Sequence, residues 1–330
     1  MLINLHTHLE GRVRPGTAAE LAAAAGLPEP VGGWARALEL DGPADLTVYL
    51  RKVASTYPLF GSREALARIA REAVEDAAAD GLDYLELRFG PATHTRPGLD
   101  LDAVIAAVCE GVAEGACGTG LPAGVVVAAL RHHDRDLNRE LAHAATRHAG
   151  SGVVGFDLAG DELLYPDIEP HREAFAIAAS AGLGLTCHAA EAAPAQAALD
   201  AVNLLNVTRI GHGAHVADDP AVMKWIAEHG IAIEICPTSN WYTGAVTSLD
   251  RHPARRFKAA GIPLVLGDDN PRQTRSPLSA EHRSLATVHE FTEADLRRLD
   301  IDSVAHAFTE FSVGQHLHAL LREPGGPGGG

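Results

Sequence analysis

Histidine and carboxylate side chains recur at four places in the sequence, each close behind a short apolar run. They are His6 with His8, His188 with Glu191, His212, and the pair Asp268 and Asp269. Three or four histidines with one aspartate form a ligand set for zinc or a similar divalent ion, with one coordination position left for water. A metal with an open position generates hydroxide near neutral pH, and Glu191 is the carboxylate available to move the proton. These residue types indicate a hydrolytic metalloenzyme.

The spacing of His6 and His8 is not sufficient evidence for a metal site. Because the chain has 18 histidines in 330 residues, about one H-x-H pair is expected by chance. His316 and His318 repeat the spacing, but in a stretch with a helical pattern, where residues two apart diverge. His6 and His8 end an expected strand, where residues two apart point to the same face. Their position at the end of an expected strand therefore makes His6 and His8, and not His316 and His318, the candidate metal ligands.

Short β-rich runs alternate with longer helical stretches along most of the chain. The expected strands cover residues 2–8, 83–89, 124–130, 153–158, 183–188, 208–212, 231–236 and 262–269. Nearly continuous apolar strands, each joined to the next by a helix, predict a parallel sheet covered on both faces. Eight such units predict an α/β fold, the (β/α)8 TIM-type barrel, with its active site at the carboxyl ends of the strands. The candidate residues follow four of these ends.

The segment from about residue 12 to 61 does not fit this repeat. It predicts extra short helices inserted after the first strand, over one mouth of the barrel. We expect a single domain over residues 1–322. The Gly/Pro-rich tail, 323–330, has nothing to pack and is expected to be disordered.

The composition limits the classes of partner. The formal net charge is −16 and no lysine/arginine cluster interrupts it, so we expect no nucleic-acid partner and no anionic membrane surface. The sequence shows no basic and apolar leader and no apolar run of spanning length, which favours a cytoplasmic protein. The four cysteines match neither a disulfide framework nor a CxxC zinc motif. The expected partner is a small molecule, and a homo-oligomer is the assembly that the sequence leaves open.

Six motifs, in their order and spacing, resemble the adenosine deaminase family of the amidohydrolase superfamily. They are HTHLEG (6–11), DLAGDE (157–162), HAAE (188–191), RIGHG (209–213), CPTSNWYTG (236–244) and GDD (267–269). The resemblance runs from residue 2 to about 290. It implies a barrel with one zinc ion per chain. It also implies hydrolytic deamination of a 6-aminopurine nucleoside, adenosine or 2′-deoxyadenosine, to the 6-oxopurine (inosine-type) product and ammonia.

The same resemblance implies a role for each site residue. The zinc ligands would be His6, His8, His188 and Asp268. Glu191 would donate a proton to purine N1, and His212 would orient and stabilise the attacking hydroxide. Asp269 would bond to purine N7, and the backbone N–H of Gly160 to N3. Glu10 would meet the sugar end of the substrate.

Three positions depart from the family pattern. Glu10 stands where many nucleoside-specific members carry Asp, whereas adenine-type and some modified-nucleoside members carry Glu. Ala190 replaces the usual Gly of the H-A-G-E motif. Asn270 follows Asp269, where the family usually runs Asp-Asp-Pro directly. The longer arm of Glu10 leaves adenine itself, or a modified 6-aminopurine nucleoside, open as the substrate.

Two other classes of protein share parts of this pattern. A phosphoesterase that begins with an H-x-H strand would assemble two or three metals from more acidic ligands, which the HAAE and RIGHG motifs do not favour. A non-catalytic nucleoside-binding protein on this scaffold would bind zinc without deaminating any 6-aminopurine. The catalytic positions are all filled, so we favour the enzyme. Elsewhere, we interpret Asp157 and Asp161 as loop-shaping residues and expect Arg88 to pair with a barrel carboxylate.

Overall fold

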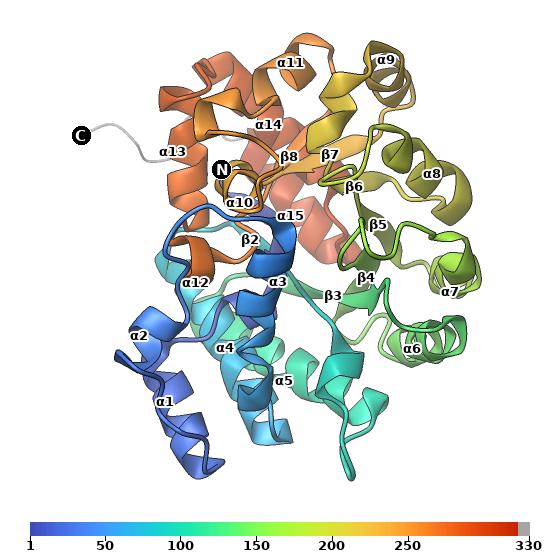
Figure 1. The fold of residues 1–330 in the computed structure, drawn as a ribbon. Helices are drawn as coiled ribbons and strands as arrows, with labels where there is room; N and C mark the ends of the chain where they lie inside the picture. The colour runs from blue at the N-terminus through green and yellow to red at the C-terminus, as the bar shows by residue number, and fades with distance from the viewer. Residues whose placement is uncertain (323–330) are drawn as a thin grey trace.

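The computed structural model describes residues 1–322, and its strands form one eight-stranded sheet in the order β1 to β8 (Figure 1). The strands are β1 (Ile3–His8), β2 (Tyr84–Phe89), β3 (Ala123–Leu130), β4 (Val153–Ala159), β5 (Gly184–Ala189), β6 (Arg209–His212), β7 (Ala232–Ile235) and β8 (Leu264–Leu266). Each strand pairs in parallel with the next along the chain. The expected (β/α)8 barrel is confirmed.

The last strand is shorter than the sequence predicts, and the residues that follow it make the backbone hydrogen bonds to the first strand. β8 ends at Leu266, and Asp269 then forms an isolated bridge with Thr7 of β1. Asp269 has a φ of 56°, in the left-handed region, which is incompatible with a continuing strand. The two aspartates expected at a strand end therefore lie in the turn beyond it.

Helices surround the barrel and also cover part of its mouth (Figure 1). They are α1 (Pro15–Ala24), α2 (Gly33–Ala37), α3 (Leu46–Ala54), α4 (Arg63–Ala79), α5 (Leu101–Thr119), α6 (Arg135–Arg147), α7 (Arg172–Ser180), α8 (Gln196–Leu205), α9 (Pro220–Glu228), α10 (Pro237–Tyr242), α11 (Ala254–Ala259), α12 (Pro271–Thr274), α13 (Leu278–Thr287), α14 (Glu293–His306) and α15 (Phe311–Arg322). The extra helices expected after the first strand are confirmed as α1, α2 and α3. Several helices begin at a polar cap; Ser62, for example, accepts a hydrogen bond from the backbone N–H of Ala65.

The two sides of the strands carry opposite chemistry because successive side chains alternate in direction. Leu87 and Ile233 pack in the main hydrophobic core with the surrounding helices. Arg88, Arg209 and Glu234 are buried on the other side. There Glu234 forms ion pairs with Arg88 at 2.9 Å and with Arg209 at 2.7 Å. The barrel interior beneath the mouth is therefore a charged network.

The C-terminal helices close the amino ends of the strands. Leu317 of α15 packs with Ile3 and Leu5 in a second hydrophobic cluster. The ring of Phe308 lies 3.6 Å from the guanidinium carbon of Arg209. In Figure 1, α14 and α15 lie behind the barrel and α3 lies in front of it. The carboxyl ends of the strands thus form the accessible mouth.

Within residues 1–322, no helix combines the length and the apolar character that a membrane span requires. The expected disordered tail, 323–330, lies outside the described residues.

Candidate active site and metal centre

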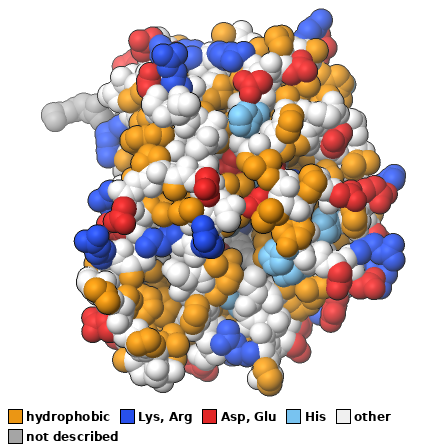
Figure 2. All heavy atoms as spheres, viewed as in Figure 1, with side chains coloured by type: hydrophobic (Ala, Val, Ile, Leu, Met, Phe, Trp, Pro, Cys, Tyr) orange, Lys and Arg blue, Asp and Glu red, His pale blue; other side chains and the backbone are white. Residues whose placement is uncertain are grey.

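A cavity of about 400 Å³ opens at the carboxyl ends of the strands. Its lining includes the predicted site residues His8, Glu10, Gly160, His188, Glu191, His212 and Asp269. Leu50 and Val53 of α3 contribute one apolar wall, and Leu164, in the loop after β4, contributes to another. Figure 2 shows hydrophobic side chains around the middle of this face of the molecule. The structure therefore brings most of the predicted site into one cavity, with His6 directly beneath it.

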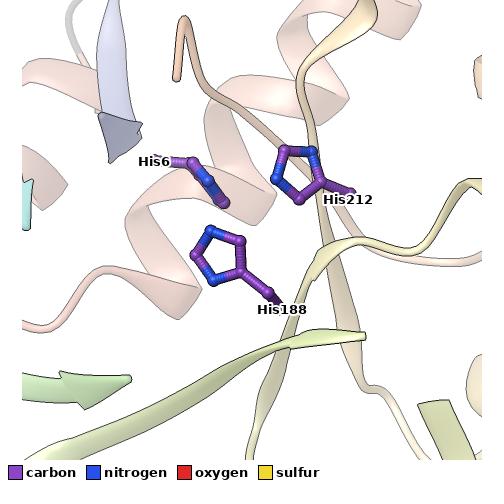
Figure 3. Close-up of side chains that lie close together, drawn as sticks. All are labelled: His6, His188 and His212. Atoms are coloured by element: carbon purple, nitrogen blue, oxygen red, sulfur yellow. The ribbon is translucent and has the colours of Figure 1, made fainter. Parts of the chain in front are cut away.

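Four imidazoles converge on the floor of this cavity. Figure 3 shows the rings of His6, His188 and His212 pointing toward one another from β1, β5 and β6. The ring centroid of His6 lies 4.7 Å from that of His188 and 4.6 Å from that of His212. His8 Nε2 lies 3.2 Å from His188 Nε2. Nitrogen atoms from strands far apart in the sequence thus meet at one point.

Of the two consecutive aspartates, Asp269 lies beside the histidines of β1. Its Oδ1 atom is 3.4 Å from His8 Nε2 and 3.7 Å from His6 Nε2. The Asp268 carboxylate pairs instead with Arg12, whose Nη2 donates to Oδ2 at 2.5 Å. Among residues 1–322, the structure shows no ion pair between Asp268 and any of these imidazoles. The resemblance assigned Asp268 to the metal and Asp269 to the purine, whereas the geometry places Asp269 at the imidazole cluster.

The donor atoms in this cluster fit a tetrahedral metal ion. Zinc bonds of about 2.1 Å space tetrahedral ligand atoms about 3.4 Å apart. Three separations in the cluster are close to this value: 3.2 Å between His8 Nε2 and His188 Nε2, and 3.4 and 3.7 Å from Asp269 Oδ1 to the Nε2 atoms of His8 and His6. His6 Nε2 is buried and has no hydrogen-bond partner within the described residues. Burial lowers the pKa of His8 to about 3, so its imidazole is neutral, which is the form that binds metals.

Two carboxylates behind the cluster orient the imidazoles. Glu234 Oε2 lies 2.6 Å from His6 Nδ1, and Asp157 Oδ1 lies 3.2 Å from His188 Nδ1. Burial opposes ionisation of Glu234, but Arg88 and Arg209 lower its pKa to about 2. Each ionised carboxylate can only accept, so the imidazole proton stays on Nδ1 and the Nε2 lone pair faces the cavity.

The interpretation of Asp157 as a loop-shaping residue is wrong, because it lies in β4 and contacts His188. The expectation that Arg88 pairs with a barrel carboxylate is confirmed by its contact with Asp157 at 3.1 Å. Asp161 does shape its loop, since Oδ1 accepts the backbone N–H groups of Leu163 and Leu164.

Glu191 is a buried acid held at the edge of the cluster. Its Oε2 atom lies 3.7 Å from His212 Nε2, and its Oε1 atom has no hydrogen-bond partner within the described part of the chain. Burial, reinforced by the charge of Asp269, raises the pKa of Glu191 to about 8. Glu162 anchors the loop, because its Oε2 accepts the backbone N–H groups of Glu191, Ala192 and Ala193. The carboxyl is therefore placed and protonated as a proton donor requires.

Glu10 lies at another side of the cavity, and hydrogen bonds to one of its carboxylate oxygens fix its position. Its Oε1 accepts a hydrogen bond from the backbone N–H of Gly90 at 3.1 Å and faces His94 Nε2 at 3.0 Å. Within residues 1–322 the structure gives no hydrogen bond to its Oε2 atom. One oxygen of a buried carboxylate that lines the cavity is thus available to a ligand donor.

Close backbone approach at two glycines makes room for the imidazoles. A Cβ atom at Gly267 would lie 2.4 Å from the Cβ of His6, and one at Gly211 would lie 3.1 Å from the Cε1 of His6. Backbone strain also gathers here, because Ala190, His212 and Asp269 adopt positive φ angles of 54°, 64° and 56°. The site is therefore built on local conformations that a smooth strand or helix would not provide.

Several side chains that position the site are not among the residues that the sequence predicts to form it. Tyr49 and Ser239 both donate to Asp269 Oδ2, at 2.8 and 2.5 Å. The side-chain amide of Asn240 contacts His212 Nδ1. Glu234 carried a detectable signal, since it is a lone charge in the apolar run IAIEIC. Ser239 and Asn240 lie in the motif CPTSNWYTG, and Tyr49 lies in one of the inserted helices, but no local pattern marks any of the three as a site residue.

Convergent imidazoles and a buried acid at the open end of an α/β barrel are typical of a metal-dependent hydrolase. Comparison with known proteins narrows this class. A family model described as adenosine deaminase matches residues 2–324. The chain belongs to the adenosine deaminase family, and it is a hydrolase that acts on C–N bonds.

Individual relatives agree with the family assignment. The adenosine deaminase of Enterococcus faecalis is 33% identical over 309 residues, covering 93% of this chain and 91% of that protein. An amidohydrolase from Burkholderia ambifaria, solved with bound zinc, is 26% identical, with a TM-score of 0.87 over 97% of this chain and 89% of that chain. The adenine deaminase of Arthrobacter aurescens shares the fold, with a TM-score of 0.88 and 24% identity over 97% of each chain. Family membership and the zinc-bound neighbour indicate a metal and a small-molecule substrate.

Proposed function

We propose that this chain catalyses the zinc-dependent hydrolytic deamination of adenosine or 2′-deoxyadenosine to the 6-oxopurine nucleoside and ammonia. The observation that carries the proposal is the position of Glu191. Its buried carboxyl lines the same cavity as the imidazole cluster, and its Oε1 atom has no partner within the described residues. A hydrolytic deaminase needs such an acid beside its metal, because the ring nitrogen must be protonated while water attacks the adjacent carbon.

We assign one zinc ion per chain to His6, His8, His188 and Asp269. Asp269 takes the place that the resemblance gave to Asp268, because its carboxylate lies between 3.4 and 3.7 Å from two of the imidazoles. When bound, zinc supplies a Lewis acid that lowers the pKa of a water molecule toward neutrality.

The residues around this centre divide the remaining tasks. Glu191 holds a proton and delivers it to purine N1, which makes C6 electrophilic. Its pKa of about 8 keeps the carboxyl protonated at neutral pH. His212, 3.7 Å away, orients the attacking water. The apolar walls formed by residues such as Leu50 and Val53 exclude bulk water from the purine.

We further propose that Asn270 replaces Asp269 as the contact to purine N7. One N–H of its amide donates to Asp269 Oδ1 at 2.7 Å, and because Asn270 lines the cavity, its second N–H would donate to N7. The backbone N–H of Gly160 would meet N3. Glu10 would accept a hydroxyl hydrogen from the sugar through Oε2, and its negative charge disfavours a phosphate at the same place.

An ultraviolet deamination assay across adenosine, 2′-deoxyadenosine, adenine and AMP tests this function, with zinc content measured on the same sample. We expect the two nucleosides to have the highest kcat/KM, with AMP at least about tenfold lower because of the charge of Glu10. A higher kcat/KM for adenine than for the nucleosides would contradict the nucleoside as the substrate and favour the free base. Stoichiometric zinc without turnover of any 6-aminopurine would overturn the enzyme and favour a binding protein.

A further inference from the structure

A buried chain of hydrogen bonds leads away from His212 behind the cavity. The Nδ2 atom of Asn240 in α10 lies 3.1 Å from His212 Nδ1, and the Oδ1 atom of Asn240 lies 3.1 Å from His252 Nε2. The backbone N–H of Ala254 donates to His252 Nδ1 at 3.2 Å. The side chains of His212, Asn240 and His252 are each at most 3% exposed. These contacts have no part in the function proposed above.

The direction of each hydrogen bond follows from the backbone amide at the far end. A peptide N–H can only donate, so His252 Nδ1 must accept and the single imidazole proton lies on Nε2. Burial lowers the pKa of His252 to about 3, which keeps this ring neutral. Its Nε2–H must therefore meet the oxygen of Asn240, and the amide NH2 of Asn240 must face His212. His212 Nδ1 then accepts, and its proton lies on Nε2.

Two of the three histidines assigned to the metal have the opposite arrangement. Glu234 and Asp157 contact the Nδ1 atoms of His6 and His188, and carboxylates accept hydrogen bonds. Those two rings carry the proton on Nδ1 and present a lone pair at Nε2. By distance alone His212 belongs with them, because ligand atoms of His6, His188 and His212 lie within 4.8 Å of one another. Only the groups behind the rings distinguish a metal ligand from a hydrogen-bond donor.

We propose that Asn240 and His252 are positioning residues that hold His212 as its Nε2–H tautomer, so that His212 acts as a hydrogen-bond donor beside the metal instead of a ligand to it. The tautomer of His212 is inferred from the hydrogen bonds alone. The expected effect on kcat rests on the proposed deaminase function. The Nε2–H of His212 is directed to the cavity near Glu191, where it can donate to the oxygen of the attacking water.

Asn240→Asp tests the direction of donation in the hydrogen bonds that join His252, Asn240 and His212. An aspartate can accept from both histidines but cannot donate, so it moves the His212 proton to Nδ1 and removes the donor from the cavity. We expect kcat to fall about a hundredfold, as for loss of one donor to a reacting oxygen, with KM within about threefold and zinc content unchanged. Long-range ¹H–¹⁵N spectra of the zinc-loaded protein labelled at histidine nitrogen report the tautomer directly, with the His212 signal identified from its loss in His212→Gln.

Two pairs of variants separate positioning from a structural role. His252→Gln keeps an N–H donor toward Asn240 and should retain most of kcat, whereas His252→Phe removes it and should lower kcat. Asn138→Asp is the matched control, because Asn138 makes a similar buried contact to His171 Nδ1 at 3.0 Å outside the cavity lining. It should cost stability and leave kcat unchanged.

The wild-type spectrum decides the proposal even if a variant fails to fold. A proton on His212 Nδ1 in the wild type, or an unchanged tautomer and kcat in Asn240→Asp, would overturn it. An Nε2–H signal for His212 that moves to Nδ1 in Asn240→Asp would support it. Failure of the proposed function is a separate result, namely absence of 6-aminopurine turnover by the wild type, and it leaves the tautomer measurement valid.

Discussion

The backbone N–H of His8 donates to the carbonyl oxygen of Asp269 at 2.7 Å, and this bond ties the end of the first strand to the turn after the last. The N–H of Asp269 in turn donates to the carbonyl of His6 at 2.9 Å. Asp269 is therefore fixed between the two histidines by its main chain. The same two hydrogen bonds therefore close the barrel and bring Asp269 to the histidine cluster.

This relationship predicts different results for the two neighbouring aspartates. Asp269→Asn should weaken zinc binding by at least about a hundredfold, because it removes an anionic oxygen from the cluster. Asp268→Asn should keep the metal but lose about 3 kcal/mol of stability, because the buried Arg12 would lose its charged partner. Chelator competition and thermal unfolding measure the two effects. Loss of zinc in Asp268→Asn alone would restore the assignment made from the sequence.

Glu191→Gln should fold and bind zinc while losing most of its turnover. The amide has nearly the shape of the carboxyl but cannot deliver a proton, so we expect kcat to fall by about 10²- to 10⁴-fold. Steady-state kinetics with adenosine, together with zinc content, would show the effect. A kcat close to that of the wild type would remove Glu191 from the mechanism.

The carboxylate behind His188 should matter for metal affinity. Asp157→Asn removes the charge that contacts His188 Nδ1, and we expect zinc affinity to drop about 10- to 100-fold. Asp134→Asn is a suitable control, because Asp134 caps α6 and asparagine caps a helix equally well. Equal zinc affinity in both variants would argue that Asp157 acts on the fold and not on the metal.

The close contact at Gly267 should make this glycine intolerant of any side chain. Gly267→Ala would place a Cβ atom 2.4 Å from the Cβ of His6, so we expect both zinc affinity and thermal stability to decrease. Gly118 lies exposed in α5, and a Cβ atom added there would meet no atom within 4 Å. Gly118→Ala should therefore stabilise the helix by about 0.5–1 kcal/mol. Unchanged zinc binding in Gly267→Ala would mean that β8 can shift away from β1.

A buried acid outside the cavity should give a pH-dependent stability. Burial raises the pKa of Glu281 to about 7, although its carboxylate accepts from the backbone N–H of Thr238 and from Ser276. The folded state therefore retains a proton that the unfolded chain releases near its ordinary pKa of about 4.5. The free energy of unfolding should fall as pH rises from about 4.5 to about 7.

Glu281→Gln removes this titration and keeps both hydrogen-bond positions. Its stability relative to the wild type should grow across the same window, by at most about 3 kcal/mol at pH 8. Denaturant unfolding at pH 5, 6, 7 and 8 would measure the difference. A difference that stays constant with pH would show that Glu281 ionises normally in the folded protein.

Much of the architecture follows from the sequence because it depends on local pattern. Apolar runs separated by helical stretches predict parallel strands, and histidines or carboxylates behind four of those runs predict a site at one end of the barrel. The expected first strand, 2–8, and sixth strand, 208–212, agree with the observed strands within one residue at each end. The motif order was sufficient to indicate the family.

The tertiary structure decided which of two adjacent carboxylates reaches the cluster. The pair Asp268 and Asp269 looks equivalent in the sequence, and only the left-handed φ of Asp269 and its two backbone bonds to β1 separate them. The protonation of each imidazole is equally non-local, because Glu234 and Asn240 come from other elements. Hydrogen bonds between residues far apart in the chain leave no local pattern, so the chemistry of each histidine becomes visible only in the folded protein.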